Sequence, residues 1–264
     1  MTETGLSGLW YDKPKKWELV ELPVHKPEED EIVIRVTATG ICGSDLHVTR
    51  GDGMDENSPE RGPLAMGHEM TGVVHSMGSK VKTDSLKKPL KEGDRVIFPF
   101  FFPCMSCYNC IKGEFGACKF RSRIPYQDFK YCNSGYSQYF VLRSPHFIFH
   151  SPESLSDEAL VSLNCALAQV VEAFNFGKIN FGDNVVIQGA GALGIYATAV
   201  ARNMGANEVI VIDGHESRLK LAEKCGASKT INISEFKSSK ERIEFIFDYT
   251  NGIGADIAIE LVGF

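Results

Sequence analysis

Hydrophobic residues follow two different patterns in the two halves of the chain. Before residue 151 they form short runs, rich in β-branched residues and separated by polar loops, and this pattern predicts strands. The runs are Trp17–Leu22, Glu31–Val36, Thr71–His75 and Arg95–Phe101. We expect no long helix in this half, and the stretch from Thr49 to Gly62, rich in Gly, Asp and Glu, is predicted as a loop. The first half therefore predicts a mostly β domain.

The second half alternates between strand and helix patterns. Acidic residues after Ser156 favour a helix start, and apolar positions recur at helical spacing from Ala159 to Phe174. Strands are then predicted at Asn184–Gln188, Glu208–Asp213, Lys229–Ile233 and Ala255–Leu261, with helices at Ile195–Met204, Ser217–Lys224 and Ser239–Tyr249. This alternation is typical of a parallel sheet flanked by helices. We predict an α/β protein with two domains, residues 1–151 and 152–264.

Charge and composition narrow the range of partners. The 28 basic and 34 acidic residues give a formal charge of −6, which argues mildly against nucleic acid or an anionic membrane as a partner. The first residues contain no basic segment followed by an apolar core, so no signal peptide is expected. We also expect no stretch of the apolar length that crosses a bilayer. Eight cysteines without a secretory signal indicate a reducing cytoplasm, where clustered thiols more often hold a metal than form disulfides.

Four cysteines form a compact group in a polar loop: Cys104, Cys107, Cys110 and Cys118. The pattern C-x2-C-x2-C-x7-C has the spacing of a tetrahedral thiolate site, and a closed shell of four sulfurs leaves no position for a substrate. An iron–sulfur cluster uses similar spacing and stays open as an alternative. We predict a structural zinc site.

A second group of chemically active residues follows the strand pattern at Glu31–Val36. Between Cys42 and His47 the chain holds a thiol, the hydroxyl of Ser44, the carboxylate of Asp45 and an imidazole. A thiolate there is able to bind a metal, and a hydroxyl followed by an imidazole is able to pass a proton to solvent. The group alone is a weak signal, because a cysteine in a turn often serves only as a small apolar residue.

A glycine-rich fingerprint lies between a predicted strand and a predicted helix. It consists of Gly189, Gly191 and Gly194, with Ala190, Ala192 and Leu193 between them, and Asp213 lies 19 residues beyond the last glycine. This context indicates a dinucleotide site: the glycines allow a tight turn and close approach of the pyrophosphate, whose oxygens lie at the helix N-terminus. Asp213 would accept hydrogen bonds from the adenosine ribose and repel a 2′-phosphate, so NAD is predicted rather than NADP.

Together these features resemble the zinc-dependent medium-chain alcohol dehydrogenase family across nearly the whole chain. The segment that begins with Gly67, His68 and Glu69 and continues to Gly72, Gly78 and Val81 fits the family signature GHE-x2-G-x5-G-x2-V at every position. The resemblance implies a GroES-like catalytic domain, residues 1–151, followed by a Rossmann domain, residues 152–264, with the active site in the cleft between them.

Transferred to this sequence, the resemblance assigns further roles. It implies that Cys42, His68 and Cys165 hold a catalytic zinc ion, with a fourth position open for the alcohol. Asp45 would orient His68, and Glu69 would lie behind the metal. Ser44 and His47 would be the protein members of a proton relay, and Phe100 a side chain of the substrate pocket.

The implied reaction is oxidation of an alcohol to an aldehyde or ketone by hydride transfer to NAD. Serine rather than threonine at position 44 leaves slightly more room, so secondary or bulky alcohols are favoured. A polyol or amino-alcohol dehydrogenase of the same family is the alternative within the enzyme class, although Cys165 argues mildly against polyol-type members. A homo-oligomer is expected for a full-length form.

The sequence also departs from the family pattern. It ends at Phe264, directly after the fourth expected strand of a six-strand order 3-2-1-4-5-6. The resemblance then implies a truncated Rossmann domain that lacks its last strands and exposes the fourth strand as a sheet edge. A third interpretation therefore remains: a zinc-loaded, catalytically silent fragment that binds a partner through this edge.

Overall fold

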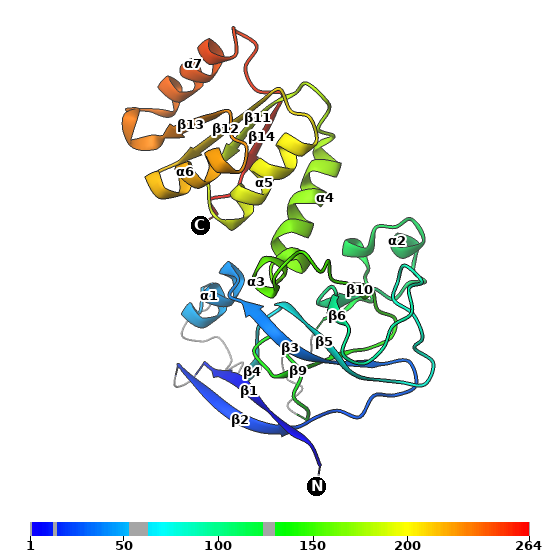
Figure 1. The fold of residues 1–264 in the computed structure, drawn as a ribbon. Helices are drawn as coiled ribbons and strands as arrows, with labels where there is room; N and C mark the ends of the chain where they lie inside the picture. The colour runs from blue at the N-terminus through cyan, green and yellow to red at the C-terminus, as the bar shows by residue number, and fades with distance from the viewer. Residues whose placement is uncertain (1, 13–14, 53–62, 124–129, 264) are drawn as a thin grey trace. The chain divides into compact units, whose positions relative to one another are not determined.

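The computed structural model describes residues 2–12, 15–52, 63–123 and 130–263. The chain divides into two compact units, residues 1–165 and 166–264, which Figure 1 draws as a ribbon. Most of the loop predicted for Thr49–Gly62, from residue 53 onward, lies outside the described residues.

The first unit is mostly β, as its short apolar runs predicted, and its sheets are antiparallel. A five-stranded sheet has the order β10-β6-β5-β3-β9, a three-stranded sheet has the order β2-β1-β4, and β7 pairs with β8. The strands are β1 (Thr4–Tyr11), β2 (Lys16–Pro23), β3 (Ile32–Gly40), β4 (Leu64–Ala65), β5 (Glu69–Met77), β6 (Arg95–Ile97), β7 (Phe101–Phe102), β8 (Ser122–Arg123), β9 (Tyr139–Leu142) and β10 (Phe149–His150). Side chains such as Ile32, Ile34, Phe98 and Phe140 are buried in its core, and the burial of this apolar surface stabilises the sheet.

Between the described strands of this unit lie three short helical segments: α1 (Gly43–Arg50), α2 (Tyr108–Ile111) and a 3₁₀ turn (Phe115–Ala117). The sequence did not predict α1, because its apolar positions do not follow a helical stripe. Contacts at the two ends of α1 stabilise it instead. The Asp45 carboxylate accepts a hydrogen bond of 3.0 Å from the backbone N–H of Cys42 at the helix start, and Gly51 ends the helix in the left-handed conformation with φ 80°.

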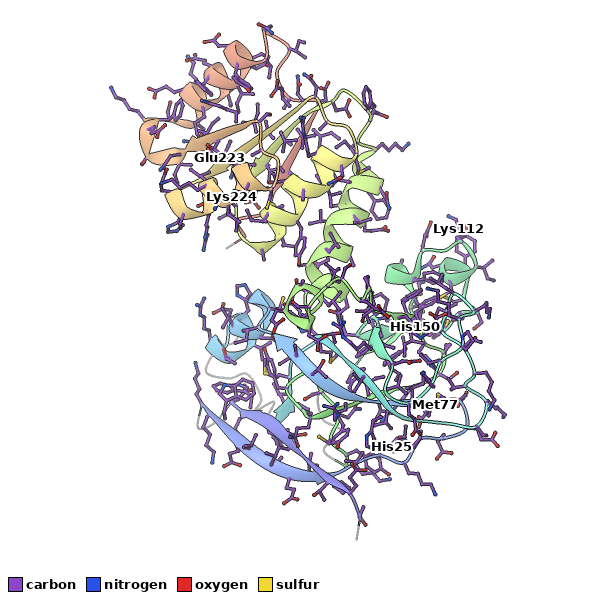
Figure 2. The ribbon with its side chains drawn as sticks, viewed as in Figure 1. His25, Met77, Lys112, His150, Glu223 and Lys224 are labelled. Carbon is purple, nitrogen blue, oxygen red and sulfur yellow. The ribbon has the colours of Figure 1, made fainter. Side chains whose placement is uncertain are left out.

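His150, labelled in Figure 2, fastens β10 to the loop before β6. Its Nδ1 lies 2.7 Å from Asp84 Oδ2, and its Nε2 lies 3.2 Å from Asp94 Oδ2. Asp84 is buried and also accepts hydrogen bonds of 2.9 Å from the backbone N–H groups of Leu86 and Lys88. One imidazole thus links two aspartates of the loop to the sheet.

The second unit is a parallel sheet with helices on both faces (Figure 1). Its order β13-β12-β11-β14 is the first part of the predicted order 3-2-1-4-5-6. The strands are β11 (Asn184–Gln188), β12 (Glu208–Asp213), β13 (Lys229–Asn232) and β14 (Ile257–Glu260), and the helices are α5 (Ala192–Asn203), α6 (Glu216–Lys224) and α7 (Ser239–Tyr249), with a 3₁₀ turn at Ile233–Glu235. Alternate residues of β11 and β12 enter two cores, one shared with α5 and α6 and the other with α7. Both faces of these strands are therefore buried.

A helical run joins the two units. It comprises α3 (Asp157–Leu160), a π-helical turn (Leu163–Leu167) and α4 (Ala168–Gly177). Because α3 contacts β3 and β5, the first unit extends to Cys165, beyond the boundary predicted at residues 151 and 152.

The run from Asp157 to Gly177 has 21 residues and is long and apolar enough to cross a bilayer by length and composition. The prediction that no stretch reaches this length is therefore wrong: the apolar face of α4, where Val170 and Phe174 pack into the core of the second unit, adds to the apolar residues of the π turn. A single helix of this composition is weak evidence for a membrane span.

Candidate functional site

The fold brings together four potential metal ligands from three distant parts of the first unit. The ligand atoms of Cys42, His68, Glu69 and Cys165 all lie within 4.8 Å of one another. The two sulfur atoms are 3.9 Å apart. A tetrahedral ion with metal–sulfur bonds of about 2.3 Å would separate its sulfurs by about 3.8 Å. The two thiols and the imidazole thus fit one metal ion.

Each ligand lies where an element begins or bends. Cys42 is the residue before α1, and His68 precedes β5. Cys165 lies in the π-helical turn, an arrangement that often occurs at functional sites. The neighbouring Asn164 donates a hydrogen bond of 3.1 Å from Nδ2 to the backbone carbonyl of His68, so two of the ligands are also joined through their neighbours.

The electrostatics favour one thiolate beside a charged imidazole. Hydrogen bonding to Cys165 and to His68 lowers the pKa of Cys42 to about 3. Hydrogen bonding to Cys42, burial and the negative charge on Cys42 together raise the pKa of Cys165. Burial alone would lower the pKa of His68, but the neighbouring Asp45 and Cys42 outweigh it and raise the pKa to about 10. Burial and the Cys42 thiolate raise the pKa of Glu69. A divalent cation would stabilise this concentration of negative ligands.

Asp45 faces the histidine, as the family resemblance implied. Its Oδ1 lies 3.6 Å from His68 Nδ1, slightly beyond hydrogen-bonding distance, and Nδ1 has no other hydrogen-bond partner in the described part of the chain. Both side chains are buried. With Nδ1 directed to this carboxylate, Nε2 is the ring nitrogen left for a metal.

Two further predicted residues lie one turn apart on α1. The side chain of Ser44 hydrogen-bonds Cys42 and helps to lower the pKa of its thiol. His47 is exposed, and its Nδ1 lies 2.6 Å from Asp52 Oδ2. Phe100 is a direct neighbour of the cluster, since its ring centroid is 4.8 Å from that of His68. Ser44 and Phe100 thus adjoin the potential ligands, whereas His47 is exposed and contacts Asp52.

The four remaining predicted cysteines form a separate cluster. The sulfur atoms of Cys104, Cys107, Cys110 and Cys118 lie within 4.8 Å of one another, and three measured pairs are 3.6, 3.8 and 3.9 Å apart. These are the sulfur separations of a single tetrahedral ion, far longer than the ~2.05 Å of a disulfide. An iron–sulfur cluster spreads its thiolates over several irons, so the distances favour a single ion.

The glycine-rich loop lies at the carboxyl end of β11, as predicted. Gly194 must be glycine, because a Cβ there would lie 1.8 Å from the carbonyl oxygen of Gly189. At Gly191, the residue before α5, a Cβ would meet no atom within 4 Å among the described residues. The open space above Gly191 and the helix N-terminus that begins with Ala192 and Leu193 fit a pyrophosphate group.

Asp213 ends the next strand and is nearly buried. Its Oδ2 accepts a hydrogen bond of 2.7 Å from the N–H of Ala190, and its Oδ1 accepts one of 2.8 Å from the N–H of His215. These bonds outweigh burial and lower its pKa. The carboxylate thus also fixes the glycine-rich loop to β12, a role that the sequence did not reveal. Arg218 Nη1 lies 3.9 Å away.

Sequence reasoning missed two contributors to the metal cluster, Asn164 and Tyr136. Tyr136 donates a hydrogen bond of 2.8 Å from its hydroxyl to Asp45 Oδ2, across 91 residues of sequence. Neither residue belongs to a local motif, so only the three-dimensional fold reveals these contacts.

Comparisons with known proteins match two stretches of the chain to two family models. Residues 28–153 match the model of the alcohol dehydrogenase GroES-like domain, and residues 192–264 match that of the zinc-binding dehydrogenases. The chain is 30% identical to 5-exo-hydroxycamphor dehydrogenase of Pseudomonas putida (93% of this chain, 67% of the relative) and 34% identical to sorbitol dehydrogenase of Bacillus subtilis (92% and 64%). It thus spans about two thirds of the length of these relatives.

A solved structure supports the predicted fold class. The crystal structure of an alcohol dehydrogenase from Thermotoga maritima superimposes with a TM-score of 0.87 at 31% identity, covering 98% of this chain and 71% of that one. The prediction of a mostly β GroES-like domain followed by a parallel-sheet Rossmann domain is confirmed.

Proposed function

Since the chain belongs to the zinc-dependent medium-chain alcohol dehydrogenase family, we propose that it oxidises an alcohol to a ketone or aldehyde with NAD as the hydride acceptor. The observation that carries the proposal is the cluster of Cys42, His68 and Cys165, whose sulfur separation of 3.9 Å fits a single metal ion. Two thiolates and one imidazole leave a fourth position for substrate.

The proposed roles follow from the positions of the side chains. Cys42, His68 and Cys165 would hold the catalytic zinc, and the four clustered cysteines a structural one. A zinc ion bound by Cys42, His68 and Cys165 would act as a Lewis acid and lower the pKa of an alcohol hydroxyl. Ser44, whose side chain hydrogen-bonds Cys42, would accept the alcohol proton, and exposed His47, paired with Asp52, would release a proton to solvent. NAD held at the glycine-rich loop would supply the two-electron acceptor for the hydride of the carbinol carbon, so that the oxidation balances.

The coenzyme preference rests on Asp213. Its buried carboxylate lies at the carboxyl end of β12, near the glycine-rich loop, and its lowered pKa keeps it ionised at neutral pH. A negative charge at this place disfavours the 2′-phosphate of NADP. We propose NAD as the coenzyme and a cytoplasmic location for the enzyme.

Secondary or bulky alcohols are the proposed substrates, and a polyol or amino alcohol is the second candidate. The relative named for 5-exo-hydroxycamphor supports a cyclic alcohol, and the relative named for sorbitol supports a polyol. The small Ser44 and the aromatic ring of Phe100 beside His68 suit an apolar substituent better than a chain of hydroxyls.

The test is NAD reduction by the zinc-loaded protein with ethanol, propan-2-ol, cyclohexanol, sorbitol and threonine. We expect higher kcat/KM for the two secondary monoalcohols, and loss of turnover to background in Cys42→Ser. Cys225→Ser is the matched control, because Cys225 belongs to neither sulfur cluster. Much higher kcat/KM for ethanol would contradict the substrate class, and turnover that survives Cys42→Ser would contradict the site.

A further inference from the structure

Tyr136 lies in a turn that is fastened to the segment just before His68. The N–H of Tyr136 donates to the carbonyl of Met66 at 3.0 Å, and the N–H of Gly135 donates to the carbonyl of Gly67 at 3.0 Å. The carbonyl of Tyr136 accepts a hydrogen bond of 2.8 Å from Gly8 on β1. Two backbone hydrogen bonds therefore fix this turn relative to the segment before the histidine, and a third fixes it to β1.

The tyrosine ring is held as firmly as its backbone. Gly67 has φ +87°, and a Cβ there would lie 2.7 Å from Tyr136 Cδ1, so the ring occupies space that only a glycine leaves open. On another side, Trp17 packs edge-on at 5.6 Å between ring centroids. A side chain fixed in this way places its hydroxyl at one point.

That point is the carboxylate beside the histidine. The Tyr136 hydroxyl donates to Asp45 Oδ2 at 2.8 Å, and the N–H of Cys42 donates to the same oxygen at 3.0 Å. With Oδ2 held by two donors, Oδ1 is the oxygen directed toward His68 Nδ1, 3.6 Å away. The orientation of the imidazole thus depends on a carboxylate whose own orientation depends on Tyr136.

We propose that Tyr136 is a positioning residue for the metal site: through its hydroxyl it fixes the Asp45 carboxylate that orients His68 for metal binding. The proposal rests on the function proposed above, since it assumes that Cys42, His68 and Cys165 bind zinc. Partners that orient metal-binding histidines typically change metal affinity 10- to 100-fold when removed. Tyr136 acts one contact further away, so we expect the lower end of this range.

The experiment measures how fast a chelator removes zinc from each of the two sites of the purified full chain. Tyr136→Phe removes the hydroxyl but keeps the ring that packs on Gly67 and Trp17. The control is Tyr139→Phe, which also removes a tyrosine–carboxylate hydrogen bond, the exposed one of 3.0 Å to Glu3. The four-cysteine site of the same molecule serves as an internal reference.

We expect zinc to leave the Cys42 site about tenfold faster in Tyr136→Phe, with unchanged release from the four-cysteine site and no change in Tyr139→Phe. In an Asp45→Asn background, the additional change Tyr136→Phe should have little further effect, because the two residues act in one chain of contacts. The visible spectrum of cobalt substituted at the Cys42 site should also change in Tyr136→Phe.

Three outcomes would overturn the inference. Release rates equal to wild type in Tyr136→Phe, with faster release in Asp45→Asn, would show that the hydroxyl does not position the carboxylate. Faster release from both sites would indicate general loosening of the fold. If the wild-type protein binds zinc only at its four-cysteine site, the proposed function fails first and the inference fails with it.

Discussion

At the residue scale, single side chains in this protein serve more than one purpose. Asp45 accepts hydrogen bonds from Cys42 and Tyr136 and also faces His68, so it caps α1 and orients a potential ligand at once. Asp213 fastens the glycine-rich loop and places a negative charge near the proposed adenosine site. A substitution at either residue therefore has both a structural and a functional effect, which matched controls separate.

Asp213→Asn should shift the coenzyme preference toward NADP. It removes the negative charge that would repel a 2′-phosphate and leaves Arg218, 3.9 Å away, free to attract one. We expect the ratio of NAD to NADP affinity to fall about tenfold, equivalent to ~1.4 kcal/mol, measured by titration of both coenzymes.

Asp256→Asn is the control for this change. Asp256 also accepts a backbone hydrogen bond, from Asn184 at 2.8 Å, but at the start of β11 rather than at its carboxyl end. A shift in preference of the same size in Asp256→Asn, or none in Asp213→Asn, would contradict the assignment.

At the element scale, local patterns predicted the regular parts of the fold well and the irregular parts poorly. The strands β11 and β12 and helix α7 begin and end where the pattern of apolar residues predicted, because their burial on one or two faces fixes that pattern. Helix α1 was missed, since its eight residues are stabilised by end contacts rather than by an apolar stripe. The π-helical turn at Cys165 has no sequence signature. The metal-binding role of Cys165 was implied only by the family resemblance.

The junction of β11 and α5 allows a paired test of two glycines. Gly194→Ala should destabilise the second unit by about 3 kcal/mol, because its Cβ would lie 1.8 Å from the Gly189 carbonyl oxygen. Gly191→Ala should leave stability nearly unchanged, because its Cβ enters open space, yet weaken NAD binding by filling the room for the pyrophosphate. Urea unfolding and NAD titration measure the two effects. Equal destabilisation by both variants would contradict the packing argument.

The contact of His150 with Asp84 and Asp94 should make the first unit's stability pH-dependent. Hydrogen bonding to Asp84 raises the pKa of His150 above 6.5 despite some burial. Burial opposes ionisation of Asp84, but hydrogen bonds from His150, Lys88 and Leu86 lower its pKa to about 2 from 3.8.

The sign of each contribution follows from these shifts. The raised pKa of His150 stabilises the fold fully below pH 6.5, and this stabilisation is lost as the pH rises through the folded-state pKa. The lowered pKa of Asp84 stabilises the fold fully above pH 3.8, and this stabilisation is lost as the pH falls toward 2. His150→Gln should therefore lower the urea midpoint of the first unit more at pH 5.5 than at pH 9. A larger loss at pH 9 would contradict the assignment.

At the scale of the whole molecule, the predicted metal-binding residues and the predicted coenzyme-binding residues belong to different compact units. Both cysteine clusters lie within residues 1–165, and the glycine-rich loop and Asp213 lie within residues 166–264. The sequence predicted the four-cysteine site in the first half and the dinucleotide fingerprint in the second, because both have local spacing. It placed Cys165 in the second predicted domain, residues 152–264, whereas the structure places it in the first unit. It did not predict Tyr136 or Asn164, since contacts across 91 and 96 residues leave no local pattern.

Metal removal and NAD binding should therefore act on different units. A strong chelator should increase hydrogen exchange in residues 1–165 and leave that of residues 166–264 nearly unchanged. NAD at a hundred times its Kd should stabilise the second unit by about 2.7 kcal/mol. Mass spectrometry of peptides from each unit measures both effects, and loss of protection in the second unit on chelation would contradict this assignment.

The most direct test of the account follows a deuterium atom from the carbinol carbon of propan-2-ol to the coenzyme. The zinc-loaded protein is incubated with propan-2-ol deuterated at that carbon and with NAD. The mass of the reduced coenzyme is then measured by mass spectrometry. The account predicts NADH that carries the deuterium, formed by the wild-type protein and by Cys225→Ser but not by Cys42→Ser. Reduced coenzyme without deuterium, or no reduced coenzyme from folded protein with zinc at both sites and NAD bound, would contradict it.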